Sequence, residues 1–268
     1  MIDPDHSKIT NIDQIKKQHG IKLTIAFSGG AETKLHQLAH DRSSESIELQ
    51  KAYSKIQIDR IERLVQEFLQ KFAGLESKIA IMTGGTKGGV PEIVSRTAKK
   101  QGFKTIGIYP EIGCKHFLGE DIIDIPLCIT STYQDCKQST HWETPSYWGD
   151  ESSVFAKTLD TVVVIGGSAG TVIEMAYVLK MNGAILKAKK KGEAGSNKLK
   201  YIVPVSGFGG VSEDLHHIWA DPEVTEESIL SFTVTGGVEK RPGRIYSGIQ
   251  AADALLFTPE LAIHDLYD

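Results

Sequence analysis

The sequence predicts a doubly wound α/β fold, in which helices cover both faces of a mainly parallel sheet. Its expected strands are short runs made almost entirely of apolar residues, such as residues 162–165, which is typical of strands buried on both faces. Segments with apolar residues at helical spacing separate these runs. A pair of glycines follows four of the runs, where a strand would turn towards a helix. Together these observations predict alternating strands and helices in one layered domain.

The first part of the chain is expected to form a strand at residues 23–27 and then a long amphipathic helix. The apolar stripe of that helix consists of Tyr53, Ile56, Ile61, Leu64, Val65, Phe68, Leu69 and Phe72. This spacing predicts one buried face. The next unit has a strand at 78–82, a helix at about 90–100 and a strand at 105–109, and its crossover should be right-handed.

A further strand is expected at residues 125–129, and a long polar connection follows it at 131–153. A connection of this length in a compact domain is a candidate lid or binding loop. Its ring-bearing residues are Tyr133, His141, Trp142, Tyr147 and Trp148. These rings either stack on a base or hold the loop against the core.

The second half should contain a strand at 161–165 and a helix at 171–181. The pair Asn182-Gly183 is a typical end of a helix, and a strand at 184–186 is expected after it. The remaining expected segments are a lysine-rich loop at 187–200, a strand at 201–205, a strand at 231–234 and a terminal helix near 249–256.

Length and composition favour one domain. The chain has 268 residues, of which 40% are hydrophobic, enough for a single core. We expect one domain over residues 1–268, with extensions around a core at 23–215. The net charge of −4 and the pI of about 6.2 give no basic surface for nucleic acid. No apolar stretch approaches the ~20 residues that span a bilayer, and a basic, apolar leader is absent from residues 1–20, so we expect a cytoplasmic protein without membrane contact.

Cysteine and histidine patterns point to neither a disulfide framework nor a metal site. Cys114, Cys128 and Cys136 are an odd number and form no C-x-x-C pair, so we interpret them as packing residues in a reducing compartment. His36 and His40 lie four residues apart on a probable helix. They have neither an H-E-x-x-H motif nor a third ligand nearby. No metal and no cofactor are therefore expected.

The glycine pairs that end four expected strands are candidate ligand-binding turns. They are Gly29-Gly30, Gly84-Gly85, Gly166-Gly167 and Gly209-Gly210. In a parallel sheet the carboxyl ends of the strands share one edge, so loops after neighbouring strands converge on one crevice. The N-terminus of a following helix favours an anion such as phosphate. The alternative is that these glycines only form tight turns.

Two of the turns lie between a strand and a helix and are the main candidates for phosphate binding. The candidate residues are Gly84, Gly85, Thr86, Gly88 and Gly89 in one turn, and Gly166, Gly167, Ser168, Ala169, Gly170 and Thr171 in the other. Neither has the G-x-x-x-x-G-K-S/T spacing of a P-loop or the G-x-G-x-x-G spacing of a dinucleotide site. Both should open onto the same edge of the sheet, where Gly29, Gly30, Gly209 and Gly210 are further candidates.

The second of these turns resembles a family signature. Residues Gly166 to Glu174 read G-G-S-A-G-T-V-I-E and are similar to the P-G-G-x-G-T-x-x-E motif of the LOG ("Lonely Guy") family, often labelled "possible lysine decarboxylase". The turn at 79–89 and the helix it opens look like that family's first glycine loop. The resemblance spans roughly residues 23–186. It implies a Rossmann-like fold and, as in relatives, a homodimer, for which the long helix is a candidate contact.

The resemblance also implies an activity. Catalytic LOG enzymes hydrolyse the N-glycosidic bond of a nucleoside 5′-monophosphate. By motif position, Gly167, Gly170 and Thr171 would hold the phosphate, and Glu174 would be the catalytic carboxylate that stabilises the developing sugar cation. The nearby helix N-terminus should help to keep Glu174 ionised. Alternatively, Thr171 and Glu174 form a T-x-x-E capping box with a purely structural role.

The chain departs from the family pattern at the catalytic arginine. The Arg-Lys pair that the family places about nine residues before the strand-opening Asp is Glu151 and Ser152 here. Lys157 or Arg96 can replace that arginine only if the fold brings one of them to the site. This departure keeps a second hypothesis open: a non-catalytic sensor of a nucleotide or an ADP-ribose-type signal. The turn at residues 205–210 is also similar to a loop of some sensing members of the wider superfamily.

Overall fold

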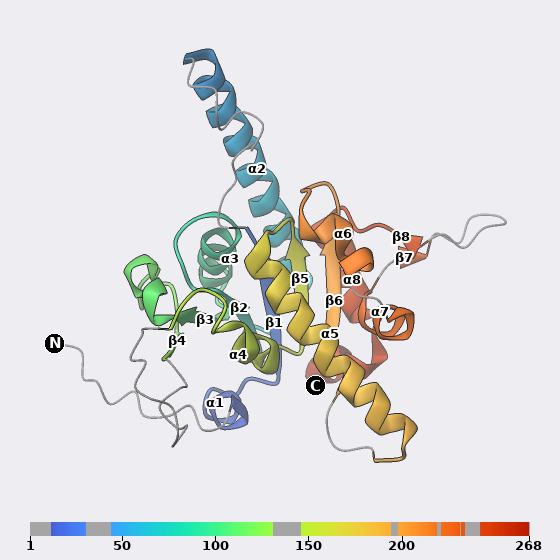
Figure 1. Cartoon of the computed structure of the whole chain (residues 1–268). Coiled ribbons are helices and arrows are strands. Elements are labelled where there is room, and N and C mark those ends of the chain that lie inside the picture. Colours follow the sequence, from blue (N-terminus) through green and yellow to red (C-terminus); the bar gives the residue numbers. More distant parts are fainter. Residues whose placement is uncertain are drawn as a thin grey trace, which may run out of the picture.

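The computed structural model describes residues 12–30, 44–130, 146–193, 198–218, 221–230, 232–233 and 242–267. Six strands form one parallel sheet in the order β4-β3-β2-β1-β5-β6 (Figure 1). The strands are β1 (Leu23–Gly29), β2 (Ile79–Thr83), β3 (Lys104–Pro110), β4 (Ile125–Ile129), β5 (Thr161–Ile165) and β6 (Tyr201–Val205). The doubly wound α/β fold that the sequence predicted is confirmed.

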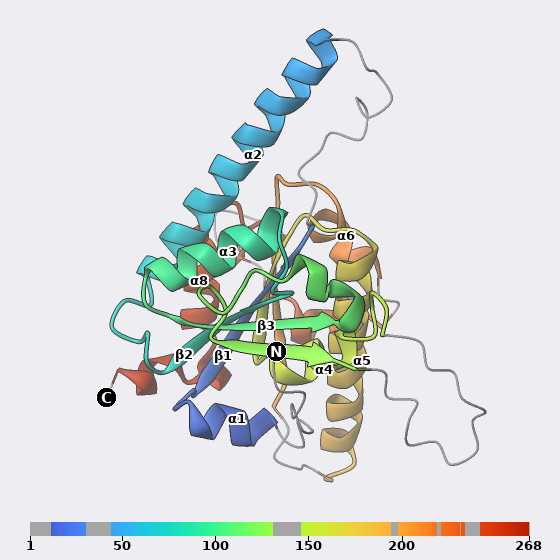
Figure 2. The ribbon, with the colours of Figure 1, turned by 90° about the vertical axis from the view of Figure 1, so that its left-hand side faces the viewer.

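Helices connect the strands and cover the sheet. They are α1 (Ile12–Gln18), α2 (Ser44–Gln70), α3 (Gly89–Lys100), η2 (Glu111–His116), α4 (Ser152–Thr158), α5 (Ala169–Lys190), α6 (Val211–Ile218), α7 (Pro222–Ser228), α8 (Gly248–Leu256), η4 (Pro259–Leu261) and η5 (Ile263–Leu266). Helices α2 and α3 lie on one side of the sheet, and α4 and α5 lie on the other (Figure 2).

The sheet reverses its winding direction at β1. The chain proceeds from β1 through β2 and β3 to β4 on one side, and returns to β5 and β6 on the other. Strand β1 therefore pairs with β2 along one edge and with β5 along the other, both parallel. The carboxyl ends of β1 and β5 form a topological switch point, where ligands usually bind in open α/β sheets.

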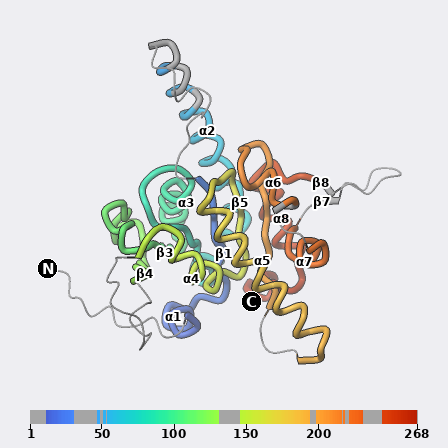
Figure 3. Tube along the Cα trace, viewed as in Figure 1, coloured from blue at the N-terminus to red at the C-terminus, as the bar shows by residue number. Residues whose placement is uncertain are grey.

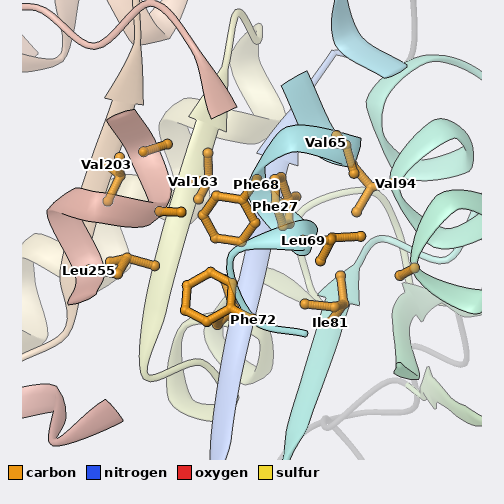
Figure 4. Packing of buried hydrophobic residues seen from close by; sticks show 14 of the residues in the cluster. Phe27, Val65, Phe68, Leu69, Phe72, Ile81, Val94, Val163, Val203 and Leu255 are labelled. Carbon is orange, nitrogen blue, oxygen red and sulfur yellow. The ribbon is translucent and has the colours of Figure 1, made fainter. Parts of the chain in front are cut away.

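Side chains of the central strand β1 alternate between two hydrophobic cores, one on each face of the sheet. Ile25 and Phe27 of β1 face α2, α3 and α8, and Ala26 faces α4 and α5. The Phe27 ring meets Phe68 edge to face, with the centroids 5.1 Å apart, and Phe72 extends this aromatic cluster (Figure 4). Both faces of the sheet are thus covered, which explains the nearly unbroken apolar sequence of the strands.

Helix α2 buries its stripe only over its second half. The stripe residues from Ile61 to Phe72 are buried. Ile56 is 56% exposed, because this part of α2 extends past the sheet (Figure 1). The side chain of Tyr53 lies outside the described residues.

Helix α5 overturns one prediction. The expected helix end at Asn182-Gly183 and the expected strand at 184–186 are wrong, because α5 continues unbroken to Lys190 (Figure 3). The fully buried Asn182 donates from its amide to the Lys200 carbonyl (2.7 Å) and to Ser228 Oγ (2.8 Å). Because these tertiary contacts saturate its side chain, Asn182 does not end the helix.

The segment after α7 lies outside the main sheet. The strand expected at 231–234 is the two-residue β7 (Phe232–Thr233), which pairs antiparallel with β8 (Pro242–Gly243). The expected terminal helix is present as α8. Within the described ranges, no helix combines the length and the apolar character that a membrane crossing requires.

Candidate functional site

The ends of β1, β2 and β5 meet at one edge of the sheet. A Cβ placed on Gly29 would lie 2.5 Å from the Ile165 carbonyl oxygen and 2.7 Å from Val90 Cγ2, so only glycine fits between β5 and α3. The Val90 N–H donates to the Gly30 carbonyl (3.1 Å). The glycine turns after β2 and after β5 therefore flank the same strand end.

The turn after β2, which we call the β2 loop (residues 84–89), is largely satisfied by its own protein. The N–H groups of Gly85, Lys87 and Gly88 donate to Thr83 Oγ1 (3.0 Å), the His116 carbonyl (2.8 Å) and Glu92 Oε2 (2.8 Å), respectively. The hydrogen bond from Gly88 is the main reason that the pKa of Glu92 lies below its ordinary value, against an opposing effect of burial. A carboxylate of the protein thus already occupies this helix N-terminus.

The β2 loop is also packed against neighbouring segments. A Cβ on Gly85, whose φ is +62°, would lie 2.8 Å from Gly107 Cα of β3. Thr86 is buried and forms an antiparallel bridge with Phe117. The structure therefore brings Gly84, Gly85, Thr86, Gly88 and Gly89 to the expected edge, but in a loop with few free N–H groups.

The turn after β5, the β5 loop (residues 166–171), is open. Ser168, Ala169 and Gly170 are exposed, and α5 begins at Ala169 without a side-chain cap from Ser168. In the part of the chain that the structure describes, the N–H groups of Ala169, Gly170 and Thr171 have no acceptor. Unpaired N–H groups and the positive end of the helix dipole favour an anion here.

The turn after β6 supports the β5 loop from behind. A Cβ on Gly210 would collide with the Gly167 carbonyl oxygen. The N–H of Ser212 donates to the Gly166 carbonyl (3.0 Å), and Ser212 Oγ accepts from the Gly166 N–H (3.0 Å). Gly209 and Gly210 therefore lie beside the site and shape its loop.

Glu174 lies on α5, one turn beyond the β5 loop, and points towards β1. Its Oε2 accepts a short hydrogen bond from the hydroxyl of Ser28, the buried residue before Gly29. The capping-box alternative is wrong, because α5 begins at Ala169 and Glu174 bonds to another strand.

Burial controls the protonation of Glu174. It raises the pKa of this carboxyl to about 8; the Ser28 hydrogen bond opposes the shift, and the charge of Glu151 adds to it. Glu174 is therefore mostly protonated at neutral pH in the free protein. The helix N-terminus was expected to help keep Glu174 ionised, but burial raises its pKa instead.

Glu151 is the second acidic group at this place. It forms the N-cap of α4, and its Oε2 accepts from the Gly149 N–H (2.8 Å). Burial raises its pKa too, against hydrogen bonds from its own N–H and from Gly149. A carboxyl thus stands near Glu174 where the LOG pattern has arginine.

Sequence reasoning missed the roles of Ser28 and Glu151. Ser28 is a hydroxyl at the end of an otherwise apolar strand, directly before a glycine pair, and that position was an available signal. The sequence indicated Glu151 only as the position where the LOG pattern has arginine. Its electrostatic effect on Glu174 depends on the packing of α4 against α5.

The two proposed substitutes for the arginine lie elsewhere. Lys157 is exposed near the end of α4, and its carbonyl accepts from Lys200 Nζ (3.1 Å) at the amino edge of the sheet. Arg96 is on α3, where it pairs with Glu92 (2.8 Å). Neither is brought to Glu174.

The remaining candidates lie outside the described residues or form no site with one another. Outside the described residues lie His36, His40, Tyr133, His141, Trp142 and Cys136. Tyr147 and Trp148 are exposed, and the Trp148 ring lies 6.3 Å from that of His116. Among the described side chains, no cluster of three metal-ligating residues forms.

The sheet order and the crossovers decide the architecture. The fold is Rossmann-like. No family model matches the chain, and no curated protein matches it significantly. The solved structures that resemble it include TM1055, at 15% identity over 86% of this chain and 96% of that one, with a TM-score of 0.47.

Two further similar structures are described as molybdenum cofactor proteins. One is the binding protein from the phototrophic bacterium Rippkaea orientalis (19% identity, 77% of this chain, 94% of that one, TM-score 0.39). The other is the carrier protein from Chlamydomonas reinhardtii (16%, 75%, 99%, TM-score 0.35). Similarities of this size do not extend to ligand or activity.

Proposed function

We propose that the chain binds the phosphate of a nucleoside 5′-monophosphate at the β5 loop and hydrolyses the N-glycosidic bond beside Glu174. One observation carries the proposal: an exposed helix N-terminus with free N–H groups lies one turn from a buried carboxyl. The first feature suits a phosphate, and the second suits a developing sugar cation. The motif resemblance to the LOG family supports the same pairing.

In the proposed reaction, water attacks the anomeric carbon of the ribose while the bond to the base breaks. The new C–O bond gives ribose 5-phosphate, and the proton from water passes to the departing base. Ionised Glu174 would stabilise the oxocarbenium-like transition state. The Ser28 hydroxyl donates to this carboxyl and would hold it in place as the charge develops.

A second function is favoured by Glu151. LOG enzymes have an arginine at this position, whereas here a second carboxyl raises the pKa of Glu174. A protonated Glu174 is a poor stabiliser of a cation, which favours a sensor that binds a nucleotide without turnover. Nucleotide binding at the β5 loop is common to both functions.

A panel of nucleoside monophosphates distinguishes the two. Chromatographic detection of free base measures hydrolysis, and thermal shift measures binding by mass action. Base release supports the enzyme, and stabilisation without base release supports the sensor. If no nucleotide is cleaved and none raises the melting temperature, both functions are wrong.

A further inference from the structure

Two cysteines at the edge of the sheet lie in direct contact. The Sγ atoms of Cys114, on η2, and Cys128, on β4, are 3.3 Å apart. Cys114 is exposed and Cys128 is partly buried. A disulfide bond is about 2.05 Å long, so a small movement of the exposed η2 residue would suffice for bonding. The interpretation of Cys114 as a packing residue is wrong, because Cys114 is exposed.

We propose that Cys114 and Cys128 form a peroxide-oxidisable dithiol that closes to an intramolecular disulfide. One oxygen of hydrogen peroxide would bond to the Cys114 thiolate sulfur as the O–O bond breaks, which gives sulfenic acid. The other oxygen leaves as hydroxide and takes up the proton that the Cys114 thiol had lost. The Cys128 sulfur then bonds to the Cys114 sulfur while the Cys128 thiol proton passes to the departing hydroxyl, which leaves as water. In total, two thiols and one peroxide give one disulfide and two waters. The two sulfurs lose two electrons, and peroxide accepts them.

The environments of the two sulfurs assign their roles. Burial, followed by the hydrogen bond with Cys114 and the nearby Glu111 carboxyl, raises the pKa of Cys128 to about 12. Cys128 therefore stays a thiol at neutral pH and is a poor first target. Solvent-exposed Cys114 meets peroxide first, and Cys128, already in contact with it, resolves the sulfenic acid.

The modification site borders the candidate functional site. The His116 carbonyl, at the end of η2, accepts from the Lys87 N–H of the β2 loop (2.8 Å). Gly113 of η2 packs against the Trp148 ring, since a Cβ there would lie 3.3 Å from Trp148 Cη2. The disulfide would link η2 covalently to β4. It would thereby fix a segment that contacts the β2 loop and the Trp148 ring.

The test uses the full-length C136S variant, in which Cys114 and Cys128 are the only thiols. The protein is treated with hydrogen peroxide, denatured in acid and alkylated with N-ethylmaleimide. We expect two alkyl groups before treatment and none after it, with a mass lower by two hydrogen atoms. Trypsin should then release peptides 105–115 and 116–137 as one linked species that dithiothreitol separates.

Two controls keep the test decisive. The C128S/C136S variant should form no internal crosslink, and its Cys114 should be trapped by dimedone as sulfenic acid. In the wild type, chymotrypsin cleaves after Tyr133 and separates a Cys128 crosslink from a Cys136 crosslink. The proposal is overturned if peroxide leaves both thiols alkylatable, takes Cys114 to sulfinic acid without a crosslink, or links only separate chains.

Discussion

The β2 loop and the β5 loop have similar sequences but differ in whether the protein itself binds their N–H groups. Each is a glycine-rich turn between a parallel strand and a helix, at the same edge of the sheet. In the β2 loop, N–H groups are bound by Thr83, His116 and Glu92. In the β5 loop, the first N–H groups of α5 have no acceptor within the described part of the chain.

The difference lies in where the nearest carboxylate points. Glu92 turns back to the Gly88 N–H and fills the position that an anion would take. Glu174 turns away from its own helix end and bonds to Ser28 of β1. A glycine turn is therefore available to phosphate only when no side chain of the protein already satisfies it.

The largest effect is expected from E174Q, which keeps the shape of the side chain but removes its ability to ionise. If Glu174 stabilises the sugar cation, base release should fall by about 100-fold or more. Nucleotide binding measured by thermal shift should persist. E92Q is the matched control in the other loop and should change the rate little. An E174Q variant with full activity would contradict the catalytic role.

Stability should depend on pH in opposite ways for the two glutamates. The folded pKa of Glu174, about 8, exceeds its ordinary value of 4.5. Its contribution is therefore complete below about pH 4.5 and is lost as the pH rises through 8. Urea unfolding should show wild type losing on the order of 2 kcal/mol relative to E174Q over this range.

Glu92 provides the reverse case. Its folded pKa is lowered, so its contribution is present above its unfolded pKa and is lost as the pH falls through the folded value. E92Q should be less stable than wild type at pH 7, and the difference should vanish in acid. A common trend in both variants would show that the local environments do not control these carboxyls.

A charge placed at the β5 loop should weaken phosphate binding. G170D is expected to reduce nucleotide affinity about 10-fold relative to the isosteric G170N, because its carboxylate repels phosphate. Gly170 has no atom within 4 Å of a built Cβ, so both variants fit. G84D and G84N in the β2 loop should bind alike in calorimetry. A larger loss of nucleotide affinity in G84D than in G170D would show that the anion binds at the β2 loop and would contradict the proposed site.

The smallest effect is expected from E151R, which places a cation where the LOG pattern has arginine. A positive charge should lower the pKa of Glu174 and raise the rate of base release a few-fold at pH 7, with the pH profile shifted towards acid. E151Q, which only removes the negative charge, should give a smaller shift. An unchanged profile in both variants would show that Glu151 does not act on Glu174.

The sequence by itself determined the six strands of the main sheet, their parallel arrangement and the edge at which the glycine turns lie, although it also predicted a strand at 184–186 that is part of α5. Apolar runs such as residues 161–165 and 201–205 became strands with the expected bounds. This succeeded because a strand buried on both faces has little freedom in composition. The resemblance at residues 166–174 directed attention to the loop that proved open.

Only the tertiary structure decided which glycine turn is free, where Glu174 points and which groups surround it. Ser28 and Glu151 reach Glu174 from segments far away in sequence, and Asn182 remains helical through contacts with Lys200 and Ser228. A glutamate side chain can accept a hydrogen bond from the N–H groups of its own helix end, as Glu92 does, or from a distant segment, as Glu174 does. The local sequence does not distinguish these two outcomes. Packing chooses between them, because it fixes which partner lies within reach and how much water remains around the charge.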